Sequence, residues 1–364
     1  MKMKKFLITA LLFTLGCNAC QNTSPTSMQT NIPEPTLTSI PTSTPEPTAV
    51  PPTSTAKIVA KKLIERGDLR TGKGPVYSQD WSADGHWLVT ADFDQVRVWD
   101  ATSYREAGLL DGHTDFIWGL AWSPSSEALI LASASQDGSV RLWDVETYTQ
   151  TALLETGWAF CVDWSPDGKQ LAVGIYTGEI QIWDAAEGQL LRTRKSETPT
   201  PIISIAWSPD GRTIAAGELD GEIYWWEAET GKLLHTITGY TSARSDTNGL
   251  AWSPDGSLLA SAHQDGKVRL WNAETLELAR TLYAHKGWVR GVAFSPDGRL
   301  LASTGEDKRI CLWDVASGQK YAEQHHNSLP VWSVSWSPDG KFVASGAGAY
   351  QEPHVGATIV WQVP

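Results

Sequence analysis

Residues 252–271 decide the fold; they read Trp252-Ser-Pro-Asp-Gly-Ser-Leu-Leu-Ala-Ser-Ala-His-Gln-Asp-Gly-Lys-Val-Arg-Leu-Trp271. In the opening phrase Pro presets φ for the second position of a tight turn, Asp suits the third, and Gly accepts the left-handed conformation. A strand of small residues follows, then a second turn at Gln264-Asp265-Gly266 and a strand that alternates polar and apolar residues up to Trp271. Alternation at period two is typical of a strand with one buried face. The stretch therefore predicts three strands joined by two tight turns.

The opening phrase, an aromatic residue followed by Ser and usually Pro-Asp-Gly, occurs seven times in all, and a fourth, more polar strand follows each third strand. The phrases start at Trp81, Trp122, Trp164, Trp207, Trp252, Phe294 and Trp336, separated by 41, 42, 43, 45, 42 and 42 residues. Each third strand ends in a second Trp, at Trp99, Trp143, Trp183, Trp226, Trp271, Trp313 and Trp361. A fixed period of this size indicates a repeat architecture, because one such unit cannot bury its own faces. We expect the thirteen recurring Trp to pack between neighbouring units.

The two ends of the repeat array complement each other. Residues 57–71 precede the first phrase without a unit of their own, and the chain stops three residues after Trp361, where a fourth strand is due. We expect the N-terminal segment to supply that strand. The closed ring would leave no exposed strand edge to promote aggregation.

The N-terminus has the pattern of a targeting signal. Residues 1–16 hold three lysines and then a short apolar run that ends at Gly16-Cys17. This resembles the leader of bacterial lipoproteins, which implies a signal peptide over 1–16, lipidation of Cys17 and an extracytoplasmic, membrane-anchored protein. Ordinary secretion and an uncleaved anchor are the alternatives. Residues 17–56 form a predicted disordered stalk, because 23 of the 35 residues from Gln21 to Thr55 are Pro, Ser or Thr.

Composition disfavours several classes of function. Without the three leader lysines, 26 basic groups stand against 41 acidic ones, and no basic patch is evident, so nucleic acid is not an expected partner. Of the four Cys, Cys161 and Cys311 read as buried small side chains. The sequence offers no metal-ligand spacing and no glycine-rich phosphate loop, and we predict neither cofactor nor metal.

Four Trp-Asp dipeptides, beginning at Trp99, Trp143, Trp183 and Trp313, together with Gly112-His113, resemble the WD-repeat family. The resemblance covers residues 57–364 and implies a seven-bladed β-propeller. It also implies a buried His, Ser, Asp and Trp network. That set is complete in two blades, as His113, Ser133, Asp137 and Trp143 and as His285, Ser303, Asp307 and Trp313. In the fifth blade Ala243 takes the His position, and the third blade lacks both His and Asp. Because the set recurs, we interpret it as scaffolding, not as a nucleophilic triad.

A candidate binding surface emerges from the loops that enter each first strand. Positions four and six residues before the turn-phrase aromatic hold large side chains in several blades, and equivalent positions in the family contact partners. An enlarged loop within residues 346–356 of the last blade adds two more candidates. The predicted partner-binding residues are Tyr77, Phe116, Trp118, Trp158, Phe160, Trp288, Arg290, Trp332, Tyr350 and His354. The alternative is that these side chains only pack the loops and the channel mouth.

Taken together, the sequence predicts an all-β, seven-bladed propeller that acts as a non-catalytic, monomeric scaffold for protein partners. A receptor for a small ligand or glycan, or less favourably a hydrolase, using the channel mouth is one alternative. A structural spacer of the cell envelope without a specific ligand is another.

Overall fold

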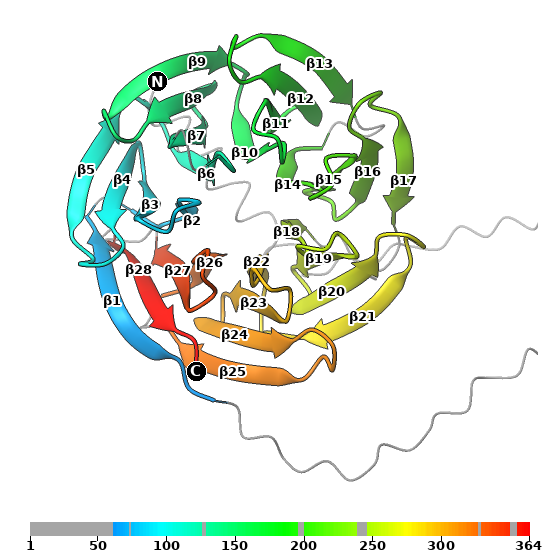
Figure 1. Ribbon diagram of the computed structural model, residues 1–364. Coiled ribbons are helices and arrows are strands. Elements are labelled where there is room, and N and C mark those ends of the chain that lie inside the picture. Colours follow the sequence, from blue (N-terminus) through cyan, green and yellow to red (C-terminus); the bar gives the residue numbers. More distant parts are fainter. Residues whose placement is uncertain are drawn as a thin grey trace, which may run out of the picture. The chain divides into compact units, whose positions relative to one another are not determined.

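The computed structural model describes residues 61–72, 74–125, 129–195, 200–238, 246–326, 329–349 and 355–364. The chain divides into two units, residues 1–55 and 56–364, and all described residues belong to the second. In this unit seven four-stranded antiparallel sheets stand as blades around one axis (Figure 1). The prediction of an all-β, seven-bladed propeller is confirmed. The predicted leader and stalk lie outside the described residues.

The blades follow the chain, each running from the axis outward. The first four are β2(Gln79–Trp81), β3(Trp87–Asp92), β4(Gln95–Asp100), β5(Glu106–Asp111); β6(Ile117–Trp122), β7(Ile130–Ser135), β8(Ser139–Asp144), β9(Thr149–Glu155); β10(Ala159–Trp164), β11(Gln170–Ile175), β12(Glu179–Asp184), β13(Leu190–Lys195); and β14(Ile202–Trp207), β15(Thr213–Glu218), β16(Ile223–Glu227), β17(Leu233–Ile237). The last three are β18(Thr247–Trp252), β19(Leu258–His263), β20(Lys267–Asn272), β21(Leu278–Tyr283); β22(Val289–Phe294), β23(Leu300–Gly305), β24(Arg309–Asp314), β25(Lys320–His325); and β26(Val331–Trp336), β27(Phe342–Ala349), β28(Val355–Gln362) with β1(Ile64–Thr71).

The recurring phrase forms the turn between the first and second strand of a blade. In the third blade the Gly168 amide donates to the Ser165 carbonyl at 2.8 Å, and Gly168 has φ of 69°. The Ser165 hydroxyl donates to Asp167 at 2.7 Å, which fixes the carboxylate against the turn. The sequence-based turn assignment is therefore confirmed, since only glycine accepts this φ without strain.

The ring closes between the two ends of the unit. β1 pairs antiparallel with β28 from Ile64 opposite Gln362 to Thr71 opposite Gly356, so the N-terminal strand is the outer strand of the seventh blade. Figure 1 shows the blue and red strands side by side at this position. Leu69 of β1 is 1% exposed and packs in one cluster with Trp81 of the first blade. Closure by the N-terminal strand is confirmed.

The core lies between neighbouring blades. One cluster joins Leu142 of β8 to Trp164 of β10, and a second joins Leu270 of β20 to Phe294 of β22. The recurring Trp also donate across the gap: the Trp164 indole Nε1 reaches the Ala121 carbonyl at 3.0 Å, and the Trp336 Nε1 reaches the Ala293 carbonyl at 3.0 Å. Trp122 and Trp252 make the same kind of bond, so among the described residues four of the seven blades are held in this way to the one before.

Among the described residues, no helix is both long enough and apolar enough to cross a membrane.

Candidate functional site

Two sets of loops meet on one face of the propeller, which we call the upper face. They are the loops that enter each first strand and the turns that connect each second strand to the third. Backbone hydrogen bonds join the two sets: between the first and second blades the Ile117 amide donates to the Phe93 carbonyl at 2.7 Å, and within the third blade the Tyr176 amide donates to the Trp158 carbonyl at 2.9 Å. Side chains from both sets therefore share one surface.

Large side chains form a continuous chain of contacts on this face, which we call the aromatic arc. Tyr176 and Trp158 stack with ring centroids 4.4 Å apart and planes 6° apart. Centroid separations then continue at 5.3 Å from Trp158 to Phe160, 5.6 Å from Phe160 to Trp118, and 4.6 Å from Trp118 to Tyr77. Tyr77 lies 5.3 Å from Trp332. The arc thus crosses the third, second, first and seventh blades.

Arg290 continues the arc into the sixth blade. Its guanidinium carbon lies 4.2 Å from the centroid of Trp288 and 4.5 Å from that of Trp332. The Nη2 atom donates to Glu306 Oε1 at 2.5 Å, and Nη1 donates to Asn248 Oδ1 at 3.3 Å. The cation is therefore held by ring faces and a carboxylate together, the combination that favours a partly desolvated guanidinium.

All eight predicted partner-binding residues that the structure describes belong to this arc. Phe116 joins it through Tyr77, at a centroid distance of 6.4 Å, and through Phe93, at 4.3 Å. Phe116 and Arg290 are buried, at 6% and 8% exposure, and the other six are half-buried. Mutual packing of the rings removes area from water that isolated rim side chains would expose.

Two arc residues were not anticipated from the sequence. Phe93 and Tyr176 directly follow the second strand of the first and third blades, a position from which the sequence suggested candidates only in the last blade. Aligning the turn after the second strand would have found both. The predicted candidates Tyr350 and His354 lie outside the described residues, as does Cys17.

The fourth and fifth blades interrupt the arc with acidic groups. Glu218, Asp220 and Glu222 offer carboxylate oxygens that all lie within 4.8 Å of one another. Asp246, in the next blade, has its pKa raised to about 6 by burial, which the positive charge of Arg290 opposes. We call these four residues the acidic sector. The upper face therefore has two parts, aromatic over five blades and acidic over two.

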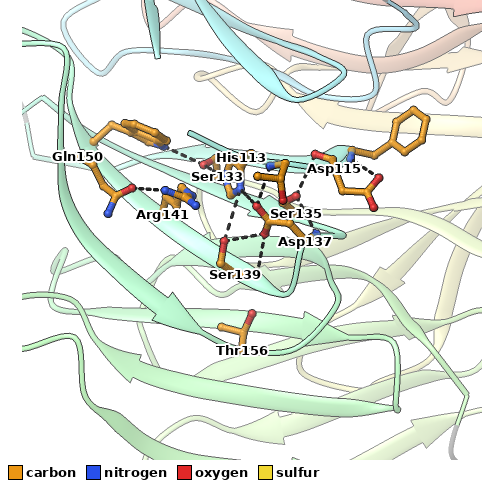
Figure 2. A network of polar contacts seen from close by, with 12 residues as sticks. His113, Asp115, Ser133, Ser135, Asp137, Ser139, Arg141, Gln150 and Thr156 are labelled. Atoms are coloured by element: carbon orange, nitrogen blue, oxygen red, sulfur yellow. Dashed lines mark hydrogen bonds and ion pairs between the residues drawn. The ribbon is translucent and has the colours of Figure 1, made fainter. Parts of the chain in front are cut away.

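Beneath this face lies the predicted His, Ser, Asp and Trp network of the second blade (Figure 2). His113 Nδ1 lies 2.8 Å from Asp137 Oδ2, and His113 Nε2 lies 2.7 Å from Ser133 Oγ, which accepts from Trp143 Nε1 at 2.8 Å. Burial raises the pKa of Asp137, but hydrogen bonds from His113 and Ser139 outweigh it and leave the pKa below its ordinary value. An anionic Asp137 assigns the His proton to Nδ1, so the Ser133 hydroxyl donates to Nε2.

The sixth blade repeats this geometry. His285 lies 2.7 Å from Asp307 Oδ1 and 3.0 Å from Ser303 Oγ, and Trp313 Nε1 donates to Ser303 at 2.9 Å. The Ser133 and Ser303 side chains are fully buried, at 0% exposure. A nucleophile needs access to substrate, so the arrangement holds loops and strands together and is unsuited to covalent catalysis.

Two further His residues take related positions that sequence analysis missed. His326, in phase with His285 at a spacing of 41 residues, bonds the Ser345 carbonyl at 2.9 Å beside Trp361. In the fifth blade His263 reaches Ser261 Oγ at 2.7 Å from within the same strand, and burial lowers its pKa to about 3. The period alone would have identified His326, whereas His263 could be found only from the rule that residues two apart share a strand face.

The space at the axis has a volume of about 560 Å³ and is lined by residues from the first-strand region of every blade. Tyr77, Arg290 and Trp332 of the arc border it, and Asp80 and Asp163 belong to its wall. Burial raises the pKa of Asp80 to about 6 and of Asp163 to about 7, although each carboxylate accepts two backbone amides. Trp122 N donates to Asp80 at 3.0 Å, and Trp207 N donates to Asp163 at 2.7 Å, so both side chains connect adjacent blades.

Two family models match the chain. The WD domain, G-beta repeat, matches residues 67–100, 105–144, 231–272, 276–314 and 318–349, which together exceed half of the chain. The anaphase-promoting complex subunit 4 WD40 domain matches residues 148–203 and 195–244, which fill the gap between the second and fifth blades.

Individual relatives match shorter stretches. THO complex subunit 3 of Arabidopsis thaliana is 32% identical over 140 residues, 37% of this chain and 44% of the relative. Protein transport protein SEC13 of Phaeosphaeria nodorum is 38% identical over 106 residues, 26% of this chain and 35% of the relative. Periodic tryptophan protein 2 of Arabidopsis thaliana is 36% identical over 118 residues, 31% of this chain and 13% of the relative. The chain thus spans less than half the length of each.

Proposed function

This chain belongs to the WD-repeat family, and from that premise we propose that it is a non-catalytic scaffold whose upper face binds protein partners. The observation that carries the proposal is the aromatic arc, which gathers side chains from five consecutive blades into one connected surface. Trp, Tyr and Arg are the residues that dominate binding energy at protein interfaces. Half-buried rings are already ordered, so a partner would lose less conformational entropy on binding them.

The names of two relatives are consistent with such a role. THO complex subunit 3 is named as a part of a complex, and protein transport protein SEC13 is named for protein transport. Both are similar to this chain over less than half of their own length, so their particular partners are not transferred.

We further propose that the scaffold is monomeric and acts outside the cytoplasm, attached to a membrane through a lipid on Cys17. The support is the leader over residues 1–16, which ends at Gly16-Cys17, and the Pro, Ser and Thr content of the following 17–56, which would extend the propeller away from the bilayer. Mass analysis of the full chain expressed in a bacterium tests this. An acylated N-terminal Cys17 is expected, and an N-terminus at any other residue would refute it.

The test of the scaffold is affinity capture from native envelopes with the full chain. A Trp118→Ala/Trp332→Ala form is compared with a Tyr148→Ala/Tyr283→Ala form, whose two aromatic residues lie in the turn before β9 and at the end of the outer strand β21. Circular dichroism and melting establish that both forms are folded. We expect the unsubstituted chain and the Tyr148→Ala/Tyr283→Ala form to capture a defined set of proteins that the Trp118→Ala/Trp332→Ala form does not capture. Equal capture by both forms would refute the upper-face scaffold.

A second candidate function is recognition of a small ligand or glycan at the channel mouth. The observation that favours it is the 560 Å³ axial space bordered by Tyr77, Trp332 and Arg290, because sugar rings stack on aromatic faces. A glycan-array signal that Trp118→Ala abolishes, in a chain that captures no protein, would favour this alternative.

A further inference from the structure

The described upper loops of the first five blades carry acidic groups and no Lys or Arg, although Asp265 pairs with Lys267 and Arg269 of the adjoining strand. On the opposite face, which carries the Ser-Pro-Asp-Gly turns, several carboxylates have basic neighbours within the turn: Asp339 lies 3.0 Å from Lys341, and Asp167 lies 3.7 Å from Lys169. In the upper loops of the first three blades, the described residues 74–78, 93–94, 112–116, 135–138, 156–158 and 176–178 contain no Lys or Arg. They contain Asp94, Asp115 and Asp137.

The acidic sector extends this imbalance around the axis. Glu218, Asp220, Glu222 and Asp246 occupy the upper loops of the fourth and fifth blades, whose described parts (200–201, 218–222, 246 and 263–266) also contain no Lys or Arg. Carboxylates grouped in this way favour cations over anions in their surroundings. Charge complementarity therefore favours a basic partner.

Arg290 shows what kind of cation suits this surface. Its guanidinium lies between the Trp288 and Trp332 rings at 4.2 and 4.5 Å and is paired with Glu306. Carboxylates also neighbour arc rings in the sequence, where Asp94 follows Phe93 and Asp115 precedes Phe116. In Figure 2 the Asp115 carboxylate points away from the His113 and Asp137 network. A planar guanidinium stacks on rings and accepts carboxylates at its edge, whereas an ammonium remains a strongly hydrated point charge.

The shape of the arc favours an extended chain. Its groups follow one another from Tyr176 to Trp288 at steps between 4.2 and 5.6 Å. The path is about 34 Å long, which about ten residues of extended polypeptide would cover at roughly 3.3 Å each.

We propose that the partner element bound by the upper face is an extended, arginine-bearing polypeptide segment. It follows the aromatic arc, its guanidinium groups stack on half-buried rings, and their charge is compensated by Asp94, Asp115 and the acidic sector. This inference rests on the proposed scaffold function and specifies the chemistry of its partner.

The test measures fluorescence anisotropy of a labelled decapeptide, Gly-Ser-Arg-Gly-Ser-Arg-Gly-Ser-Arg-Gly, titrated with the full chain. Peptides with Lys, Gln or Glu at the three Arg positions serve as comparisons. We expect the Arg peptide to bind at least about tenfold tighter than the Gln peptide and about threefold tighter than the Lys peptide. The Glu peptide should not bind. If the Arg and Gln peptides bind equally, the proposal is overturned; equal binding of the Arg and Lys peptides would overturn the stacking of guanidinium on the rings.

Matched variants locate the site. Asp115→Asn/Glu222→Gln should weaken the Arg peptide about fivefold at low salt and reduce the salt dependence, because two upper-face charges are lost. Glu187→Gln/Glu229→Gln removes two exposed charges near the opposite face and should change affinity less than about twofold. Equal loss in the two forms would mean non-specific attraction and overturn the proposal. If the aromatic arc is needed to capture proteins but the Arg peptide does not bind, the proposed scaffold function is retained and the proposed arginine-bearing partner is overturned.

Discussion

The Asp163 carboxylate accepts a 2.7 Å hydrogen bond from the backbone amide of Trp207, and this contact joins the third blade to the fourth. The other oxygen accepts from Trp164 N at 2.9 Å within its own blade. Asp80 makes the equivalent pair of bonds between the first and second blades. Five blades have Ala or Ser at this position, namely Ala121, Ala206, Ala251, Ala293 and Ser335. Two half-buried acids thus perform a joining role that the other blades do without.

These acids predict a dependence of stability on pH. Burial raises the pKa of Asp163 to about 7, above its value in the unfolded chain, so the unfolded chain releases its proton first as pH rises. The free energy of unfolding should therefore fall between about pH 4 and pH 7, by on the order of 2 kcal/mol after allowing for partial contact with the channel. Urea unfolding of the wild type and Asp163→Asn across this range measures it. The variant should show the smaller slope; parallel curves would contradict the assignment.

Replacing Ser133 measures how much the buried network contributes to the free energy of unfolding. Ser133→Ala should lower the free energy of unfolding by about 2 to 3 kcal/mol, because the Trp143 indole N–H and His113 Nε2 both lose their partner in a dry site. Ser303→Ala should cost a similar amount in the sixth blade. The control is Ser257→Ala on an exposed turn, with a cost below about 0.5 kcal/mol. Loss of partner binding at unchanged stability would instead indicate a direct functional role.

Gly138 and Gly266 end equivalent Gln-Asp-Gly turns of the second and fifth blades, and we expect their substitution by Ala to destabilise the protein unequally. Gly138 has φ of 94° with no atom closer than 3.9 Å to an added Cβ, so Gly138→Ala should cost only about 1 kcal/mol of backbone strain. In Gly266, at φ of 79°, an added Cβ would lie 2.5 Å from the His285 carbonyl oxygen. Backbone cannot move aside as a flexible side chain can, so Gly266→Ala should cost at least about 1 to 2 kcal/mol more. Thermal unfolding of the two variants compares them directly, and equal costs would count against the close contact.

Ring closure predicts that Leu69 behaves as a core residue although it lies near the start of the propeller. Leu69→Ala should lower the free energy of unfolding by about 2 to 4 kcal/mol, as should Leu154→Ala on the outer strand of the second blade, since both side chains are 1% exposed. Arg70→Ala, on the solvent side of the same strand, is the control and should be nearly neutral. Chemical denaturation gives the values. A neutral Leu69→Ala would mean that the N-terminal strand contributes little to closure.

The sequence by itself determined the architecture, because each repeat contains its own turn residues, strand alternation and paired Trp, and these act over a few residues. The Ser-Pro-Asp-Gly phrase specifies a tight turn wherever it occurs, and a period of about 42 residues can close only by stacking units around an axis. The absent fourth strand after Trp361 likewise indicated that the N-terminal segment completes the last blade.

Only the tertiary structure decided how distant loops combine. That Trp158 stacks on Tyr176, that Arg290 fits between Trp288 and Trp332, and that Phe116 is buried all depend on side chains from different turns or different blades meeting at one face. In the fifth blade, where Ala243 takes the His position of the repeat, His263 bonds Ser261 instead, and this too depends on tertiary structure. A hydrogen bond needs the right position and direction of the side chain, not a fixed place in the repeat. Local rules fix each blade, whereas the ring brings its loops together and thereby creates the surface.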